Sequence, residues 1–432
     1  MIDDVERYEL SRPPTYRFEV ERREFMRIFA ALGGGLLVAS APEAAPQESG
    51  RSGRQAAAAD LAAWIHIDDT GGITAHTGKT EIGQNIRTSL AQAVADELHV
   101  PLARVSLVMA DTDLTPYDQG TFGSQSTPRM APVLARAAAT AREMLIDRAA
   151  ALWTVDRARL TCGDGRIAGE GRSIGFGDLV KGARLAGVVP ADAPIAAPAA
   201  WTVRGTPAKK VDGRPFVTGG HRYTPDLTRP GMMYGRVIRS DGYTGTLASL
   251  DDSGARGMPG VIVVREGEFA GVIAPTERLA RRAAAAVRTE WRIPEGLPSS
   301  ATVYELLKKS EMPGGGRGTT PVRSGDVAAA RAAAARTFDA RYHIPYIAHV
   351  PLEPRAAVAE WRDGRLTVWT GTQRPFGVRA ELASAFHVPE DRVRVIVPDT
   401  GSAYGGKHTG EHAVEAARLA KAAGKPVKLV WT

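Results

Sequence analysis

Cysteine is almost missing from this sequence: Cys162 is the single one among 432 residues. One thiol cannot form an internal disulfide, hold a cysteine-ligated iron–sulfur cluster or build a C-x-x-C zinc site. Any iron–sulfur centre that works with this chain is therefore expected on another polypeptide. Cys162 stands beside a Gly163-Asp164-Gly165 turn signal, and we interpret it as a small, partly buried residue rather than a catalytic thiol.

Runs of like charge are missing as well. The formal net charge of +7 would suit a phosphate-bearing ligand or an acidic partner, but the basic residues are scattered along the chain. We therefore expect no nucleic-acid partner. The hydrophobic share of 44% and the charged share of 24% are ordinary for a globular protein, and 432 residues allow two or three domains.

No apolar run reaches the roughly 20 residues that a membrane-spanning helix needs, so we expect no permanent membrane span. A shorter run, residues 28–41, follows the pair Arg22-Arg23, and this order is typical of a Tat export signal. Ala39-Ser40-Ala41 offers a cleavage site after residue 41, and residues 42–59 have the composition of a linker. The pattern predicts a periplasmic protein; the alternative is an N-terminal amphipathic helix.

Two distant segments share one pattern. Residues 90–111 predict a helix, then His99-Val100-Pro101, then a strand; residues 378–399 predict a helix, then His387-Val388-Pro389, then a strand. The matched positions keep the same separation along the chain. We interpret them as a duplicated helix–turn–strand unit.

Each unit leads into a loop of small residues, Gly120 to Ser126 and Gly401 to Lys407, and a glutamine precedes each unit, Gln84 and Gln373. Glycine lets a backbone approach a ligand closely, and a following helix start favours an anion. An amide side chain can both donate and accept a hydrogen bond. We predict that the two loops form two walls of one site; the alternative is that they are only tight turns.

The second loop also resembles a phosphate-binding P-loop. Gly401 to Lys407 nearly matches G-x-x-x-x-G-K-[ST], but His408 stands where the pattern has the Ser or Thr that binds magnesium. A nucleotide-binding protein is therefore a remote alternative.

Three groups of motifs resemble the molybdopterin-binding subunits of the xanthine dehydrogenase and aldehyde oxidase family. Pro351-Leu352-Glu353-Pro354, Gly371-Thr372-Gln373 and the loop that ends at Lys407 are similar to the first part of its molybdopterin-binding domain. The motifs Tyr223 to Asp226, Pro230 to Ser240 and Met258 to Val261 resemble its hammerhead domain. The segment from Thr80 to Arg142 is similar to one that lies near the C-terminus in xanthine dehydrogenases, so the order here resembles the permuted isoquinoline 1-oxidoreductase beta-subunit type.

The resemblance implies an α+β, multidomain fold with a partial molybdopterin-binding domain. After the signal (1–41) and the linker (42–59), it implies a permuted molybdopterin-binding segment (60–200), an a/b hammerhead domain (203–300), a connector (301–336) and the first part of the molybdopterin-binding domain (337–432).

It also implies site residues, with no metal-ligating side chain among them. The residues that match cofactor-binding positions of the family are Gln84, Gly123, Ser124, Ser126, Gln373, Gly405 and Gly406, and those that match substrate-binding positions are Phe122, Tyr404 and His408. His408 stands where xanthine-oxidising members have a glutamate, which argues against a purine substrate. Asn85 replaces the glycine that usually follows the first glutamine.

The implied activity is hydroxylation of an N-heterocycle or an aldehyde with oxygen from water. The implied cofactor is molybdopterin with molybdenum, in its cytosine dinucleotide form, with iron–sulfur clusters on a two-cluster small subunit. The family's catalytic base is a glutamate in a glycine-rich context that this sequence does not show; Glu81, Glu353 and Glu411 lie near site motifs, and we interpret them as ion-paired or solvated. We therefore expect the base on a second chain that carries the missing C-terminal segment, and no activity from this chain alone. The alternative is a non-catalytic remnant or cofactor-binding module.

Overall fold

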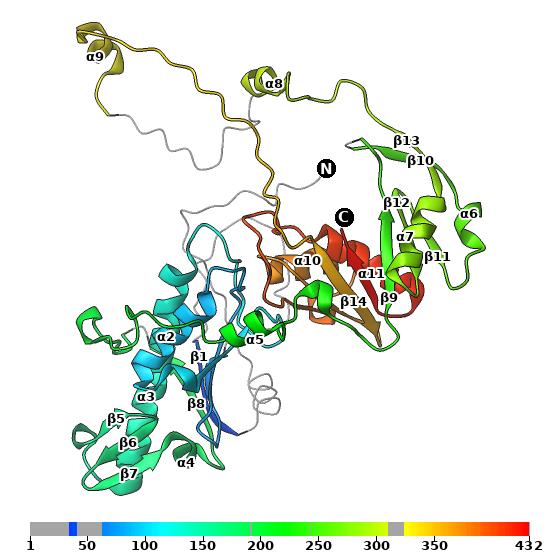
Figure 1. Ribbon diagram of the computed structural model, residues 1–432. Coiled ribbons are helices and arrows are strands. Elements are labelled where there is room, and N and C mark those ends of the chain that lie inside the picture. The colour runs from blue at the N-terminus through cyan, green and yellow to red at the C-terminus, as the bar shows by residue number, and fades with distance from the viewer. Residues whose placement is uncertain (1–33, 41–62, 191, 243, 310–323, 432) are drawn as a thin grey trace.

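A computed structural model describes residues 34–40, 63–190, 192–242, 244–309 and 324–431. Their strands form two large mixed sheets, each covered by alanine-rich helices (Figure 1). The first sheet belongs to the N-terminal half and the second to the C-terminal half. Among these residues, no helix combines the length and apolar character that a membrane span requires.

The first sheet has five strands in the order β4-β3-β2-β1-β8. Its strands are β1 (Gly35–Ser40), β2 (Ala63–Ile67), β3 (Ile73–Thr77), β4 (Val105–Met109) and β8 (Arg184–Val189). The helices α2 (Ile86–Leu98) and α3 (Ala131–Trp153) pack against each other, and α3 also packs on β1, β2 and β8. Leu90, Val94 and Leu98 repeat at a spacing of four residues and are fully buried, as expected for the core-facing stripe of a helix.

Beyond α3 the chain forms a small three-stranded sheet with a short helix beside it. Its members are β5 (Thr161–Gly163), β6 (Arg166–Gly169), β7 (Arg172–Gly175) and α4 (Phe176–Val180). Burial raises the pKa of the Cys162 thiol to about 11, which keeps it protonated at neutral pH. This supports the interpretation of Cys162 as an unreactive, partly buried residue.

The second sheet has seven strands in the order β11-β12-β9-β17-β14-β15-β16. They are β9 (Met233–Ile238), β11 (Ile262–Glu266), β12 (Phe269–Ala274), β14 (Ala356–Arg362), β15 (Arg365–Thr370), β16 (Val393–Ile396) and β17 (Val427–Val430). The helices that pack on them are α6 (Ser253–Arg256), α7 (Glu277–Ala286), α10 (Pro375–Phe386) and α11 (Glu411–Ala423). A short helix, α5 (Gly213–Thr218), precedes β9 in the chain. A separate pair, β10 (Thr246–Asp251) and β13 (Arg288–Arg292), extends from it.

The segment that resembles a hammerhead domain keeps only the pair β10 and β13 to itself, and its other three strands join the second large sheet. Strand β9 pairs in parallel with β17, so β9, β11 and β12 continue the sheet that β14 to β17 form. The segments 203–300 and 337–432 therefore share one sheet. The sequence could not show this, because the pairing joins residues about 200 positions apart.

The duplicated unit is present in both halves. In the first, β3, α2 and β4 form a unit with parallel strands; in the second, β15, α10 and β16 do the same. Each helix ends at a histidine in the left-handed conformation, His99 (φ 49°) and His387 (φ 52°), and each is followed by a short 3-10 turn. The prediction of a repeat is thus confirmed.

The two units meet where their last strands end. Asp111 and Ile396 form an isolated antiparallel bridge between the two sheets. The Val397 amide donates to the Ala110 carbonyl at 3.0 Å, and the Thr112 amide to the Val395 carbonyl at 3.0 Å. This contact places the loop that follows β4 beside the loop that follows β16.

Strand β1 occupies part of the segment predicted to be a removable signal. It lies between β2, with which it is antiparallel, and β8, with which it is parallel. The pair Arg22-Arg23 and the predicted linker 42–59 lie outside the described residues.

The connector between the hammerhead-like segment and β14 contains α8 (Val303–Lys309) and α9 (Val327–Ala333). From α9 a long extended stretch runs back to β14 (Figure 1). It presents large side chains that are 74–90% exposed: Phe338, Tyr342, Ile344, Tyr346, Ile347 and Leu352, with only Val350 slightly lower at 72%.

Candidate functional site

Gln373 joins the two glycine loops. Its side chain is buried; Nε2 donates to the Thr121 carbonyl at 2.8 Å, and Oε1 accepts from the Gly405 amide at 2.8 Å. Its backbone carbonyl accepts from the Thr121 amide at 2.8 Å, and its backbone amide donates to the Lys407 carbonyl at 2.9 Å. One residue therefore holds the loop after β4 to the loop after β16, which confirms that the two loops lie together.

A buried ion pair between Lys79 and Asp118 holds the start of the first loop. Lys79 Nζ donates to Asp118 Oδ1 at 2.8 Å and to the Gly120 carbonyl at 2.6 Å. At the far end of the loop Gly123 (φ 62°) and Ser124 (φ 56°) are left-handed and exposed. Ser126 then opens a π-helical turn, η2 (Ser126–Met130), that leads directly into α3. Such turns are rare in proteins, and those that occur often lie at functional sites.

Lys407 is fully buried below the second loop, where its Nζ lies 3.5 Å from Glu353 Oε1. Glu353 Oε2 also accepts a hydrogen bond from the Gly401 amide. Burial lowers the pKa of Lys407 and raises that of Glu353. The lysine of a P-loop must reach the phosphates of its ligand, and the inward position of Lys407 argues against the P-loop alternative.

Gln84, the counterpart of Gln373, folds back on its own turn. Its Nε2 donates to the Thr80 carbonyl at 3.0 Å, and its Oε1 accepts from the Ile82 amide at 2.7 Å. The residue is exposed. The turn itself contacts the second loop, because the Thr400 amide donates to the Glu81 carbonyl at 2.8 Å.

The predicted substrate residues separate into two groups. Phe122 and His408 lie together, with ring centroids 5.4 Å apart. Burial, and after it the neighbouring Arg374, lowers the pKa of His408 to about 4, so its imidazole is neutral at neutral pH. Tyr404 is 66% exposed with φ 57°, so it projects from the same loop without being packed into it.

The three glutamates near the motifs have structural partners. The Glu81 carboxylate accepts from the amides of Gly83, Asn85 and Arg87 and so caps the start of α2. Glu353 pairs with Lys407, and Glu411 forms an ion pair with Arg355. Glu353 and Glu411 are thus ion-paired, as interpreted from the sequence, and Glu81 caps a helix.

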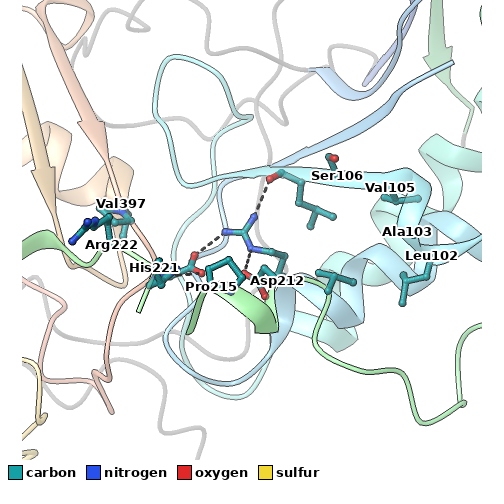
Figure 2. A pocket seen from close by; sticks show the side chains of 15 residues that line it. Leu102, Ala103, Val105, Ser106, Asp212, Pro215, His221, Arg222 and Val397 are labelled. Atoms are coloured by element: carbon teal, nitrogen blue, oxygen red, sulfur yellow. Dashed lines mark hydrogen bonds and ion pairs between the residues drawn. The ribbon is translucent and has the colours of Figure 1, made fainter. Parts of the chain in front are cut away.

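A cavity of about 730 Å³ is lined by residues from 102–107 at the start of β4, from the segment 211–222 and from 397–399 after β16 (Figure 2). Arg87, just after the Gln84 turn, and Asp399, just before the second loop, both line it. Arg87 donates to Asp399 Oδ1 at 2.7 Å and to the Leu107 carbonyl at 2.9 Å. No predicted site residue lines this cavity, and its charged walls are largely paired with each other.

The described residues contain no group of three or more His, Cys, Asp or Glu side chains arranged to hold a metal ion. Sequence reasoning missed two contributors. Thr121 contributes only backbone atoms, and its position inside the first loop is its sole signal; His349 lies against the second loop, where its Nε2 would be 3.1 Å from a Cβ built on Gly405.

Comparison with known proteins identifies the domains that carry the two loops. Two family models, both described as a molybdopterin cofactor-binding domain, match the chain, one over residues 21–224 and the other over residues 314–432. Each match contains one of the two glycine loops.

Curated relatives carry related names. A nicotinate dehydrogenase subunit of Pseudomonas putida is 33% identical over 384 residues, which are 86% of this chain and 32% of the relative. The beta subunit of isoquinoline 1-oxidoreductase from Brevundimonas diminuta is 26% identical over 479 aligned residues, which cover 98% of this chain and 60% of the relative. The chain thus spans about a third to three fifths of the length of these relatives.

Among solved structures, quinoline 2-oxidoreductase from Pseudomonas putida 86 matches with 23% identity and a TM-score of 0.42, over 51% of this chain and 34% of that one. The two domain matches, the curated relatives and the paired loops agree with one another. The chain belongs to the xanthine dehydrogenase and aldehyde oxidase family of molybdopterin cofactor-binding subunits.

Proposed function

We propose that this chain forms part of the molybdenum-binding subunit of a molybdenum hydroxylase that oxidises an N-heterocycle or an aldehyde with oxygen from water. The observation that carries the proposal is the Gln373 side chain, which holds the two glycine loops together. A site built from both loops needs such a link, because the loops come from two different sheets, which are bridged where the edge strands β4 and β16 end.

The residues present fit a large, oxygen-rich cofactor. A glutamine amide has two N–H donors; Gln373 uses one of them on Thr121, which leaves one for a ligand. Gly405 (φ 100°) and Gly123 (φ 62°) adopt backbone conformations that favour glycine, and they let main-chain atoms approach a ligand closely. Gln373, Ser124 and Ser126 would hold the cofactor through neutral hydrogen-bonding groups.

The bound cofactor would supply the metal centre at which the substrate is oxidised. Phe122 and His408 of this chain form one wall beside the loops, and the neutral imidazole adds no charge to it. An aromatic ring beside a neutral imidazole suits a flat heterocycle or an aldehyde. The names of the nicotinate and isoquinoline relatives favour the heterocycle.

We also propose that a further polypeptide segment covers the extended stretch before β14. Phe338, Tyr342, Ile344 and Ile347 fall within ten consecutive residues and are each at least 78% exposed. Scattered exposed apolar side chains are normal, but a contiguous series of them marks an interaction surface. The family's remaining molybdopterin-binding segment, with its base, is the proposed occupant. A cytosine dinucleotide form of the cofactor and a two-cluster iron–sulfur small subunit complete the proposal.

Metal loading tests this function. The chain would be produced alone and together with polypeptides that carry the remaining segment and the iron–sulfur clusters, and molybdenum content and dye-linked oxidation would be measured. We expect little molybdenum and no turnover from the chain alone, and both from the assembly. In the assembly, Gln373→Ala should lower molybdenum content by about 10-fold or more, the size of effect seen when a supporting hydrogen bond of a metal site is lost.

The matched control is Gln119→Ala, which removes an exposed glutamine just before the first glycine loop. This variant should bind as much molybdenum as the unaltered assembly. Full loading and turnover with Gln373→Ala would contradict the proposed site. An assembly that holds molybdenum but oxidises neither aldehydes nor N-heterocycles would favour the alternative, a cofactor-binding module without catalysis.

A further inference from the structure

Part of the apolar run that follows the twin arginine, residues 35–40, is built into the fold. Residues 35–40 form β1, an inner strand of the first sheet, with six residue pairs to β8 on one side and four to β2 on the other. In this sheet β1 is the strand that joins β2 to β8. Removal of β1 would therefore leave two strands with unpaired backbone edges inside the domain.

The side chains of β1 belong to the core. Leu36, Leu37 and Val38 are fully buried, and Ala39 is 5% exposed. Consecutive buried residues on a strand are typical of one that is covered on both faces. Leu36 and Val38 share a single hydrophobic cluster with Leu134 of α3.

The chain enters β1 through a close fit that only glycine allows. Gly35 has φ 128°, and a Cβ at this position would lie 2.2 Å from the Ile67 carbonyl oxygen. Its amide donates to the Ala183 carbonyl at 2.8 Å, and His66 Nε2 lies 3.3 Å from the Gly34 carbonyl oxygen. These contacts are specific to this segment and go beyond general apolar burial.

The extent of the family match also favours retention of β1. The molybdopterin cofactor-binding domain match begins at residue 21 and runs to residue 224. It therefore includes the twin arginine and the whole apolar run, which a removable signal would place outside the domain.

We propose that β1 is a permanent part of the domain, and that the chain is not cleaved after Ala39-Ser40-Ala41. A peptidase needs its substrate extended and accessible, whereas Ala39 is buried and paired with Val188 and Ala63. The segment that carries Arg22-Arg23 then stays attached to the folded protein. The strand is retained whether or not Arg22-Arg23 directs export.

The retained strand supports the cofactor loop. Helix α3 packs directly on β1 and β8, and α3 continues from the π-helical turn that begins at Ser126. Loss of β1 would remove part of the surface on which α3 packs, and the segment Gly123 to Ser126 leads into α3 through that turn. Retention of β1 thus supports the first wall of the site.

Intact mass and N-terminal sequencing test the proposal. The full chain, with a C-terminal tag, would be produced in a bacterium with working twin-arginine export and leader peptidase, and purified from each compartment. We expect every folded fraction to retain residues 34–41. A folded fraction whose N-terminus is Pro42, and which unfolds at the same temperature as the uncleaved chain, would overturn the proposal.

Paired variants add a second readout. Deletion of residues 2–33 should leave the cooperative thermal transition in place, whereas deletion of residues 2–41 should abolish it or leave the chain insoluble. Leu37→Asp places a charge in the buried strand and should act like the longer deletion, while Val188→Asp on the neighbouring strand, at a side chain that is 55% exposed, should not. If the chain without residues 2–41 folds as cooperatively as the chain without residues 2–33, β1 has no structural role. The same conclusion follows if Leu37→Asp and Val188→Asp unfold at the same temperature.

Discussion

At the scale of single residues, the site region is held by buried polar groups that stay neutral or pair with each other. His412 is fully buried beside Thr370, whose Oγ1 lies 2.8 Å from His412 Nε2. His76 is likewise fully buried, and its Nδ1 lies 2.9 Å from the Leu114 carbonyl oxygen. Both side chains pack in the β-strand and helix layers that carry the loops, so their protonation matters for folding.

These histidines predict a loss of stability in acid. Burial lowers the pKa of His412 to about 3 and that of His76 to about 4, from the ordinary value of 6.5. Below pH 6.5 the unfolded chain binds protons at these positions and the folded chain does not, so their contribution is complete above pH 6.5 and is lost as the pH falls. Each histidine contributes a slope of up to about 1.4 kcal/mol per pH unit.

Urea unfolding between pH 7.5 and pH 4.5 measures this slope. Burial raises the pKa values of carboxyl groups such as Glu353 and Glu415, and these groups make the protein less stable as the pH rises. The effect of each histidine is therefore read from the difference in slope between the variant and the unaltered chain. His412→Gln can keep a hydrogen bond to Thr370 and should flatten the slope by roughly 1 kcal/mol per pH unit. The control, His343→Gln at an exposed position, should leave the slope as it is. A His412→Gln slope equal to the unaltered one would show that this group binds protons equally in the folded and unfolded states.

At the scale of elements, the duplicated unit repeats its helix ending as well as its order. His99 and His387 each end a helix in the left-handed conformation, and the next residues, Val100 and Val388, donate back to carbonyls inside the helix. Glycine is the usual residue in this position because the left-handed conformation is strained for other residues. Histidine here therefore costs stability in both halves.

Substitution at the second helix end tests this interpretation. His387 is exposed, so His387→Gly should raise the free energy of unfolding by roughly 0.5–1 kcal/mol. Ala380→Gly, at an exposed position inside the same helix, should lower it by about 1 kcal/mol. Chemical denaturation of the two variants gives opposite signs if the geometry is right; destabilisation by both would mean that the His387 side chain makes a contribution larger than its backbone cost.

At the scale of the whole molecule, two sheets carry one wall of the site each, and the chain between them is long and exposed. The N-terminal sheet also contains the strand that overlaps the targeting motif. A protein that receives its cofactor before export has to cross the membrane folded, and the twin-arginine route carries folded proteins. We propose that this chain takes that route to the periplasm.

Cell fractionation tests the route. Arg22→Lys together with Arg23→Lys should trap the chain in the cytoplasm, because the twin arginine is the feature that this pathway reads. Arg12→Lys together with Arg17→Lys changes nearby arginines in the same way and should leave the distribution unchanged. A double-lysine chain that still reaches the periplasm would show that the pair is not an export signal.

Local patterns in the sequence were sufficient for the repeat, the two glycine loops and the pair of glutamines. Helix periodicity, the His-Val-Pro turns and the positions of glycine are encoded within about 20 neighbouring residues, and such patterns report backbone conformation directly. The family's motif spacing then indicated the cofactor. The tertiary structure was not needed for any of these.

Contacts between distant segments decided the rest. A short apolar run looks the same whether it is a signal core or a strand buried on both faces, and only the pairing of residues 35–40 with 184–189 identified the strand. Gln84 and Gln373 have equivalent places in the sequence, yet only Gln373 reaches across to the other loop. Lys407 matches a phosphate-binding motif, but its buried partner Glu353 lies 54 positions earlier in the chain and turns it inward. Side-chain direction depends on which neighbours burial brings together, and that information lies in the packing of the two sheets.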